Sequence, residues 1–511
     1  MKQHKPTRRD FLKTGVAGLT ALALPAHASN AEATLFAIEE TSVVELQAQM
    51  KSGAVTARRL VEMYLGRIRE IDPKLKAVLE INPDALALAD QLDKERRRGR
   101  GRSPLHGIPV LIKDNIDTAD KMKTTAGSLA LVDAPAPLRD AFIVKRLRDA
   151  GAIILGKTNL SEWANFRSTK SISGWSGRGG QTNNPYILDK NPCGSSAGTG
   201  VAISANLAAV GIGTETNGSI ICPATRNCLV GIKPTLGLVS RSGIIPIAHT
   251  QDTAGPMTRT VADAAALLSA LVGVDKLDAI TSDAAKGAKD YTKFLDKDGL
   301  RGARIGLARQ FIGNNPAQKI LWEMQFEELK GLGATLVDVA FSDEIGKLGD
   351  ARLNVLLYEF KTDLNQYLAG RRSPYRTLAD LIKFNEDHKD KEMPLFGQEL
   401  FMQAQAKGEL TDAAYLESLK KVKSATRENG IDAVLAKDKL DAIIGPASGA
   451  TWSIAAVAGY PYITVPAGFS YGLPFGLGFF GRAFSEPSLI KFAYAYEQKT
   501  TARRKPEYLP K

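Results

Sequence analysis

The spacing of apolar residues predicts a chain that begins with helices and continues with short buried strands. Residues 41–100 are predicted to be helical, because residues 42–45 (Ser-Val-Val-Glu) have the form of a capping box and apolar residues recur at helical spacing up to Pro73. The apolar run 108–112 is typical of a buried strand, and it ends in the polar residues 113–115.

Later segments continue this alternation. The amphipathic segment 140–150 and the apolar run 152–155 predict a helix followed by a strand. Residues 340–430 are charged and mostly helical in pattern, so we expect an insertion packed beside the sheet that forms one wall of the substrate cleft. Between residues 441 and 480 short apolar runs return, divided by Gly and Pro, which predicts further strands of the same sheet. The predicted fold class is α/β.

Glycines gather between residues 171 and 220, where ten of fifty residues are glycine against 46 in the whole chain of 511. Aromatic and apolar residues are interspersed among them. The segment therefore indicates backbone in unusual conformations rather than a flexible linker.

The N-terminus has the features of an export signal. Residues 7–13 (Thr-Arg-Arg-Asp-Phe-Leu-Lys) have the twin-arginine form, and the mildly apolar stretch 14–24 leads to a small-residue cleavage site at 26–28. The stretch is shorter than the roughly 20 residues that a spanning helix requires. We predict a twin-arginine signal peptide over residues 1–28 and a mature protein over 29–511. It would use the twin-arginine export machinery, be periplasmic or secreted, and have no stable membrane insertion after processing. A permanent amphipathic anchor is the alternative.

Charge and cysteine content exclude other classes. Of the formal charge of +12, residues 1–28 contribute +4, from five basic residues and one acidic residue, which leaves +8 for the rest. This surplus is spread along the chain, which indicates a solvated face and no nucleic-acid partner; a basic substrate channel is the alternative. The three cysteines, Cys193, Cys222 and Cys228, form no CxxC pair and no zinc-type cluster with histidine. The sequence therefore predicts neither a disulfide framework nor a structural metal.

Three kinds of segment contain a serine in a pattern typical of a nucleophile. Residues 194–198 match G-x-S-x-G around Ser196, but turn-forming residues precede them where a nucleophile elbow needs a strand. S-x-x-K occurs at 418–421 and 488–491, where solvated helix positions are the simpler interpretation. The glycine-rich turn 211–220 ends near a serine, and its backbone N–H groups can converge on an oxyanion.

Together these segments resemble the amidase signature family over most of the mature chain. The family's lysine segment matches residues 107–114, its G-S-S-[GA]-G segment matches 194–198, and its G-T-[DE]-x-G-G-S-I turn matches 213–220. Residues 459–468 are similar as well. The resemblance implies a single large α/β/α domain, with a central mixed β-sheet flanked by helices, and implies no cofactor and no metal.

The resemblance also implies a catalytic triad, with Ser219 as the nucleophile, Ser195 as a bridging serine after a cis peptide, and Lys113 as the base. The oxyanion hole would consist of four backbone N–H groups, those of Thr216, Asn217, Gly218 and Ser219. Lys113 follows four apolar residues, and burial would lower its pKa from about 10.4 toward the range of a general base. The adjacent Asp114 would oppose this shift, but consecutive residues can point apart, so we expect it to face elsewhere.

One position departs from the family pattern. The family usually has glycine where this chain has Asn217. Because Asn tolerates positive φ better than other non-glycine residues, we expect the turn to form, with a side chain that narrows or polarises the site. Ile221 stands where many members have arginine or glutamine, so we expect any contact made by such a polar side chain to be absent in this protein.

Residues 159–167 and 174–181 look most like the peptide amidase branch, whose members remove ammonia from C-terminally amidated peptides. Trp163, Phe166 and Trp175 within them are expected to be ordinary core residues, and direct contact with the substrate is the alternative. The resemblance therefore implies a serine amidase that converts carboxamides, C-terminal peptide amides in particular, to carboxylate and ammonia through an acyl-enzyme on Ser219. The predicted signal peptide implies that this amidase is exported. The alternatives are an amidase or esterase for small aliphatic or aryl substrates, an amidotransferase component of the kind that modifies glutamyl-tRNA, and an inactive binding protein.

Overall fold

The computed structural model describes residues 37–509, so the predicted signal peptide lies outside the described residues. Within these described residues, eleven strands form one mixed sheet. In spatial order the strands are β1 (Val78–Ile81), β3 (Ile153–Thr158), β2 (Pro109–Lys113), β6 (Val210–Glu215), β8 (Thr253–Thr258), β7 (Val230–Lys233), β12 (Tyr462–Ser470), β13 (Leu473–Phe480), β11 (Ala442–Pro446), β9 (Arg304–Leu307) and β10 (Thr335–Asp338). Strands β3, β2 and β6 are parallel neighbours, as are β11, β9 and β10, and the other pairs are antiparallel. A small separate sheet contains β4 (Trp175–Ser176) and β5 (Gly180–Gln181).

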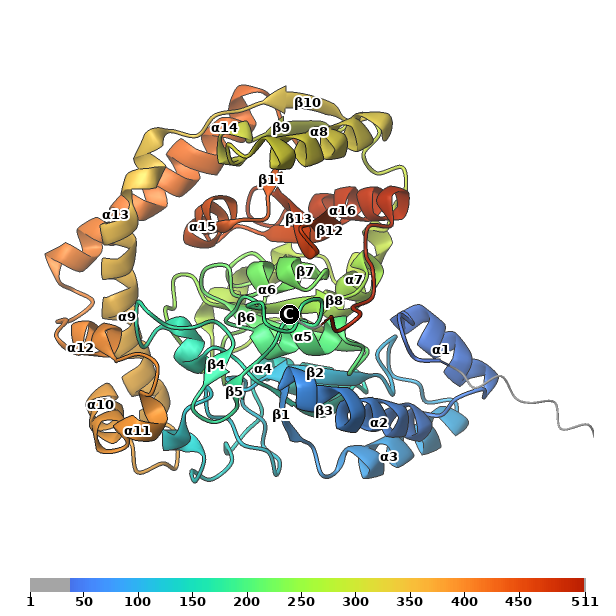
Figure 1. The fold of residues 1–511 in the computed structure, drawn as a ribbon, viewed down its shortest axis with the longest axis vertical. Helices are drawn as coiled ribbons and strands as arrows, with labels where there is room; N and C mark the ends of the chain where they lie inside the picture. The colour runs from blue at the N-terminus through green and yellow to red at the C-terminus, as the bar shows by residue number, and fades with distance from the viewer. Residues whose placement is uncertain (1–36, 510–511) are drawn as a thin grey trace, which may run out of the picture. The chain divides into compact units, whose positions relative to one another are not determined.

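Helices flank the large sheet (Figure 1). Their bounds are α1 (Val43–Ser52), α2 (Ala57–Leu75), α3 (Ala85–Arg97), α4 (Phe142–Asp149), α5 (Ala197–Ser204), α6 (Ile221–Arg226), α7 (Val261–Leu271), α8 (Pro316–Gly331), α9 (Gly349–Ala369), α10 (Leu378–Asp387), α11 (Lys389–Glu392), α12 (Glu399–Gln405), α13 (Ala413–Thr426), α14 (Asp432–Lys437), α15 (Gly449–Ala458) and α16 (Glu486–Thr500). Helix α5 packs on β2, β6 and β8, and α6 packs on β7, β12 and β13. The predicted α/β fold with a mixed sheet flanked by helices is confirmed. Among residues 37–509, no helix combines the length and apolar character that crossing a membrane requires.

Glycines on β6 let α5 lie directly on this strand. A Cβ added to Gly211 would come within 2.6 Å of Thr199 on α5, and one added to Gly213 would come within 2.8 Å of Ser196. Real Cβ atoms do not approach other atoms so closely. The glycine-rich pattern is therefore partly a packing requirement at this helix–strand contact.

Several predicted elements are present. The capping box at Ser42 begins α1, the run 108–112 gives β2, and the three C-terminal strands belong to the same sheet. The prediction of continuous helix over 41–100 is wrong, because β1 interrupts it and pairs antiparallel with β3. That strand has only four half-buried residues, too few for a periodic pattern. Helix α2 also continues past Pro73 to Leu75.

The charged segment 340–430 contains helices α9 to α13 (Figure 1). Helices α9, α10 and α12 share a hydrophobic cluster with buried residues from segments 126–131, 163–166 and 245–248. Two aromatic residues of the peptide-amidase-like segments belong to this cluster. The ring of Phe166 lies 4.9 Å from that of Phe360 on α9, and the ring of Trp163 lies 5.7 Å from that of Phe401 on α12. Trp175 is also buried, so the interpretation of these three residues as core is confirmed.

Candidate active site

The topology of three elements brings the sequence motifs together. Strands β2 and β6 are parallel, so Lys113 at the end of one lies at the same edge as the loop that follows the other. Helix α5 runs back to the start of β6, so its N-terminus also lies at this edge. Ligands of open α/β sheets bind at the carboxyl ends of such strands.

Lys113 is fully buried and bonds to a serine. Its Nζ lies 2.7 Å from Ser195 Oγ, 2.9 Å from Thr214 Oγ1 and 3.3 Å from the Thr214 carbonyl oxygen. Burial lowers the pKa of Lys113 to about 7, and the more distant carboxylates of Asp252 and Glu215 only partly oppose this effect. A lysine in this state is neutral for a large part of the time near pH 7 and can accept a proton.

Asp114 faces away from Lys113, as expected. Its carboxylate accepts hydrogen bonds from Arg178 at 3.1 and 3.2 Å and from the Thr125 hydroxyl. The guanidinium of Arg178 also pairs with Glu80 at 2.5 Å. Asp114 therefore belongs to a separate buried ion cluster, and no carboxylate in the described part of the chain forms an ion pair with the lysine.

Two other lysines in the sheet are fully buried, and the sequence analysis did not single them out. Burial lowers the pKa of Lys157 on β3 and that of Lys233 on β7, the latter to about 8. Lys233 donates to two backbone carbonyls, and Lys157 donates to a carbonyl and a threonine hydroxyl. Of the three fully buried lysines in the described part of the chain, only Lys113 meets a serine.

The two consecutive serines before α5 have different surroundings. The peptide bond between Gly194 and Ser195 is cis, as the family resemblance implied. The Oγ atom of Ser196 donates to the carbonyl oxygen of Thr214 at 3.1 Å and accepts a hydrogen bond from the N–H of Thr214 at 3.2 Å. The N–H of Ser196 also donates to the carbonyl oxygen of Ser219 at 3.2 Å. Ser196 therefore joins two segments of the site, and no strand leads into it as a nucleophile elbow would need.

The loop after β6 presents free backbone donors. Within residues 37–509, the N–H groups of four consecutive residues donate to no other group of the chain: Thr216, Asn217, Gly218 and Ser219. Gly218 has φ +83°, and a Cβ there would lie 2.4 Å from Trp452 Nε1. Asn217 does not have a positive φ, so its backbone does not adopt the left-handed conformation that was expected at this position. Its side-chain oxygen accepts a bond from Ser453 Oγ at 2.7 Å, which turns the side chain toward α15.

Buried carboxylates fix the two ends of this loop. Glu215 accepts the N–H groups of Ile220 and Ile221 at 2.8 and 3.0 Å. At the other end, the Thr216 hydroxyl donates to Asp252 at 2.5 Å. Burial raises the pKa of Asp252 to about 6. Sequence reasoning missed Asp252, because this residue lies 36 positions after Thr216 and belongs to none of the motifs.

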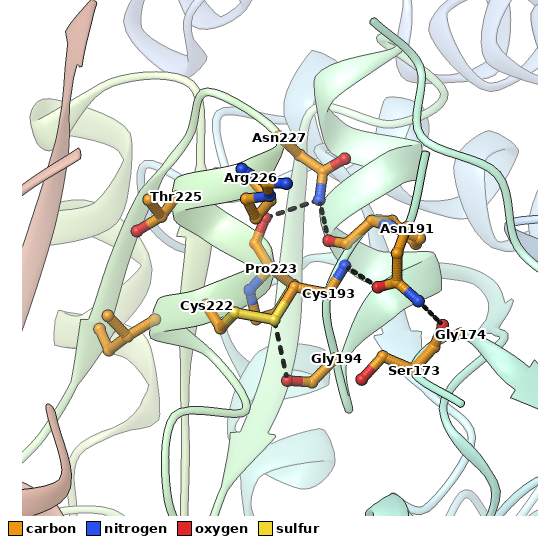
Figure 2. Close-up of a disulfide and its surroundings, with 12 residues drawn as sticks. Ser173, Gly174, Asn191, Cys193, Gly194, Cys222, Pro223, Thr225, Arg226 and Asn227 are labelled. Atoms are coloured by element: carbon orange, nitrogen blue, oxygen red, sulfur yellow. Dashed lines mark hydrogen bonds between the residues drawn. A yellow bond between two sulfur atoms is a disulfide. The ribbon is translucent and has the colours of Figure 1, made fainter. Parts of the chain in front are cut away.

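A disulfide joins Cys193 to Cys222, with 5.8 Å between the Cα atoms (Figure 2). The prediction that the cysteines indicate no disulfide is therefore wrong. The two residues are 29 positions apart, and nothing local in the sequence marks the pair, which the fold alone brings together. Cys228 is free and buried.

A cavity of about 510 Å³ lies against residues 214–216. Residues 241–247 and His249 form one side, and residues of α9, among them Tyr367, together with the nearby Arg371, form another. The helical insertion thus forms a wall of a cavity next to the candidate site. Cavities of this size hold small ligands or a few residues of a peptide.

The part of the chain that the structure describes has one group of side chains with the spacing of metal ligands, namely His249, Glu359 and Asp363. These atoms already have partners. The Nδ1 atom of His249 lies 2.9 Å from Asp363, and Glu359 accepts bonds from Tyr415 and Thr250. The group therefore forms a hydrogen-bonded ion network beside the cavity.

A buried lysine of lowered pKa, bonded to a serine and next to a row of free N–H donors, is suited to acyl transfer. Residues 59–454 match the family model named Amidase, so the chain belongs to the amidase family. It is a C–N hydrolase that acts on amides.

Known proteins resemble the chain over nearly its full length. The peptide amidase from Stenotrophomonas maltophilia is 52% identical, with a TM-score of 0.88 over 92% of this chain and 99% of that one. A protein of Arabidopsis thaliana named "probable amidase" is 43% identical over 93% of each chain. A component of the glutamyl-tRNA(Gln) amidotransferase of Thermoanaerobacter pseudethanolicus is 34% identical over 91% of this chain and 98% of its own.

Proposed function

We propose that the protein is an exported serine amidase that hydrolyses C-terminal peptide amides, with Ser219 as nucleophile, Ser195 as bridging serine and Lys113 as base. The observation that carries the mechanism is the 2.7 Å contact between Lys113 Nζ and Ser195 Oγ at a buried site. Ser219 is the most accessible of the three residues at 9% exposed, against 0% for the other two. This difference in exposure suits a nucleophile that contacts the substrate and a base that is shielded from water.

The first half of the reaction forms an acyl-enzyme. Ser219 Oγ attacks the amide carbonyl carbon while its proton passes to Ser195, whose own proton passes to Lys113. The carbonyl oxygen becomes an oxyanion that the N–H groups of residues 216–219 stabilise. The proton then returns through Ser195 to the amide nitrogen, and ammonia leaves.

The second half releases the product by the same route. Water attacks the acyl-enzyme and gives its proton, through Ser195, to Lys113. The tetrahedral intermediate collapses, Ser219 recovers this proton from Lys113 through Ser195, and the peptide acid departs and gives its remaining proton to solvent. Each step uses only the three side chains and the N–H groups of the site.

Two observations support peptide amides as substrates. The S. maltophilia enzyme, 52% identical to this chain, is a peptide amidase. The cavity against residues 214–216 has a volume, about 510 Å³, that suits the end of a peptide. Because substrate preference depends on loops, the substrate class needs its own test.

The test is ammonia release by residues 29–511 on three amides, namely a C-terminal peptide amide, a free aliphatic amide and an aryl amide, together with acid release from an ester. Release that favours the peptide amide and disappears in Ser219→Ala supports the proposal. Equal or faster turnover of the small substrates keeps the triad and overturns the peptide assignment. Activity that survives in Ser219→Ala means that the nucleophile is another residue. Ser196→Ala is the matched control, one position from the bridging serine.

Export rests on the twin-arginine form of residues 7–13, and the Cys193–Cys222 disulfide supports it because such bonds persist in oxidising compartments. The test is cell fractionation of the full chain and of its Arg8→Lys/Arg9→Lys variant. Retention of only the variant in the cytoplasm supports export. The amidotransferase alternative predicts instead a cytoplasmic chain that co-purifies with other proteins of such an enzyme.

A further inference from the structure

The disulfide lies close to both serines of the proposed mechanism. Cys193 stands two residues before Ser195, and Cys222 stands three residues after Ser219. The bond therefore closes a loop that contains both serines and all of β6. Lys113, on β2, lies outside this loop.

On the Cys193 side, movement of the cysteine is transmitted directly to Ser195. Only Gly194 separates them, and a Cβ there would lie 2.3 Å from Ser161 Oγ, so the backbone at this position packs closely against Ser161. The N–H of Cys193 donates to the Asn191 side chain at 2.8 Å, which in turn donates to the Ser173 carbonyl oxygen at 3.0 Å (Figure 2). The turn that contains Cys193 is thus fixed to the neighbouring chain.

On the Cys222 side, a single hydrogen bond connects the cysteine to the residue that precedes the nucleophile. The N–H of Cys222, in the first turn of α6, donates to the carbonyl oxygen of Gly218 at 2.7 Å. Gly218 directly precedes Ser219 and carries one of the free N–H groups. A shift of Cys222 therefore displaces both the nucleophile and the proposed oxyanion hole.

One buried side chain provides a second, non-covalent link between the same segments. The Asn227 side-chain nitrogen donates to the Pro192 carbonyl oxygen at 3.0 Å and to the Pro223 carbonyl oxygen at 2.7 Å (Figure 2). These residues directly neighbour the two cysteines. The segments therefore stay associated without the disulfide, while the covalent bond sets their exact separation.

We propose that the Cys193–Cys222 disulfide is a positioning device for catalysis, which holds Ser195 and Ser219 at the separation that proton transfer requires. The disulfide form has full turnover, and the dithiol form stays folded but turns over slowly. The inference rests on the proposed function, because it takes both serines as catalytic. Misplacement of reacting groups by about 1 Å can cost about a hundredfold in rate.

A small dithiol can convert one form into the other, because both cysteines are partly exposed. Dithiothreitol gives two electrons and two protons to the sulfurs, which become two thiols, and itself becomes a cyclic disulfide. Glutathione disulfide reverses the change, as the two cysteines re-form their bond and two glutathione thiols are released. Cys228 is buried and takes no part.

The experiment measures kcat and KM of residues 29–511 on a peptide amide before reduction, after reduction and after reoxidation. Thiols are counted by alkylation and mass spectrometry, and the folded fraction by circular dichroism. We expect one free thiol before reduction and three after it. We expect a fall in kcat of about tenfold or more, KM within about twofold, and recovery with glutathione disulfide.

Two variants serve as controls. Cys193→Ser/Cys222→Ser is expected to have the low kcat of the reduced enzyme and no response to dithiol. Cys228→Ser is expected to respond like the parent chain, which excludes an effect of the free cysteine.

Three outcomes would overturn the proposal: three free thiols in the untreated enzyme, an unchanged kcat after complete reduction, or a loss of kcat that matches the loss of folded protein. In each of these cases turnover that still depends on Ser219 leaves the proposed function intact. Turnover that survives in Ser219→Ala overturns the proposed function instead.

Discussion

Lys113 Nζ lies 2.7 Å from Ser195 Oγ, and no carboxylate between residues 37 and 509 forms an ion pair with this lysine. The carboxylate next in sequence, on Asp114, pairs with Arg178 instead. Because the carboxylate of Asp114 pairs with Arg178 and not with Lys113, the lysine is neutral for a large part of the time near pH 7. The contacts around it lead to predictions on pH dependence, on the lysine itself, on the adjacent serines and on the loop that carries the N–H donors.

The first prediction concerns pH. Burial lowers the pKa of Lys113 to about 7, and the proposed base is its neutral form. The value of kcat/KM should therefore rise about tenfold per pH unit below pH 7 and level off above about pH 8. The measurement is kcat/KM on one amide from pH 5 to 9, and a flat profile from pH 5 to 8 would contradict the assignment.

Lys113→Met, with Lys233→Met as the matched control, tests the same residue. Both lysines are fully buried and have a lowered pKa, but Lys233 donates only to backbone carbonyls. Loss of the base should lower kcat by about a hundredfold or more, whereas the control should affect thermal stability and leave kcat within about threefold. Thermal unfolding identifies any variant that fails to fold, and equal loss of kcat in both variants would count against Lys113.

The next prediction separates the two adjacent serines. Ser196 Oγ bonds only to the backbone of Thr214, so Ser196→Ala should cost about 1–2 kcal/mol of unfolding free energy and leave kcat within about fivefold. Ser195→Ala should instead lower kcat by several orders of magnitude with a smaller effect on stability. Denaturant unfolding and steady-state kinetics on both variants check this. A larger loss of kcat in Ser196→Ala would favour the nucleophile-elbow interpretation.

The contact between Asn217 and α15 supports a further prediction. Ser453 donates to the Asn217 side chain at 2.7 Å and accepts from Arg352 at 3.0 Å. Asn217→Ala and Ser453→Ala should each lower kcat by about three- to tenfold, since each frees the loop that carries the N–H donors. The double variant should be no worse than the poorer single one. Strictly additive losses would show that the two side chains act independently.

The last prediction concerns Gly218. A Cβ there would lie 2.4 Å from the indole nitrogen of Trp452 at a φ of +83°, so Gly218→Ala must move the loop. We expect kcat to fall by about a hundredfold, with far-UV circular dichroism unchanged. Gly180→Ala is the control, because it also has a positive φ but an added Cβ would meet nothing within 4 Å. A similar loss in both variants would show that backbone strain, and not this contact, is responsible.

Much of the sheet could be predicted because its strands are short, apolar and bounded by polar or turn-forming residues. The run before Lys113 became β2, and the C-terminal runs became strands of the same sheet. Strand β1 was missed because its four residues are half-buried and give no alternation. The turn was expected to depend on the tolerance of Asn217 for positive φ, but Gly218 is the residue with that conformation.

The sequence by itself determined which residues are candidates for the chemistry, because Lys113, Ser195 and Ser219 each stand in a short contiguous motif. It also made burial of the lysine predictable, since an apolar run leads directly into it. Only the tertiary structure decided what holds those residues in place. Asp252, Ser453 and Trp452 contact the loop from distant segments. Cys193 forms a disulfide with Cys222, although α5 and β6 separate the two residues along the chain. Such pairings depend on how strands and helices pack in space, and the separation of two residues along the chain does not specify that packing.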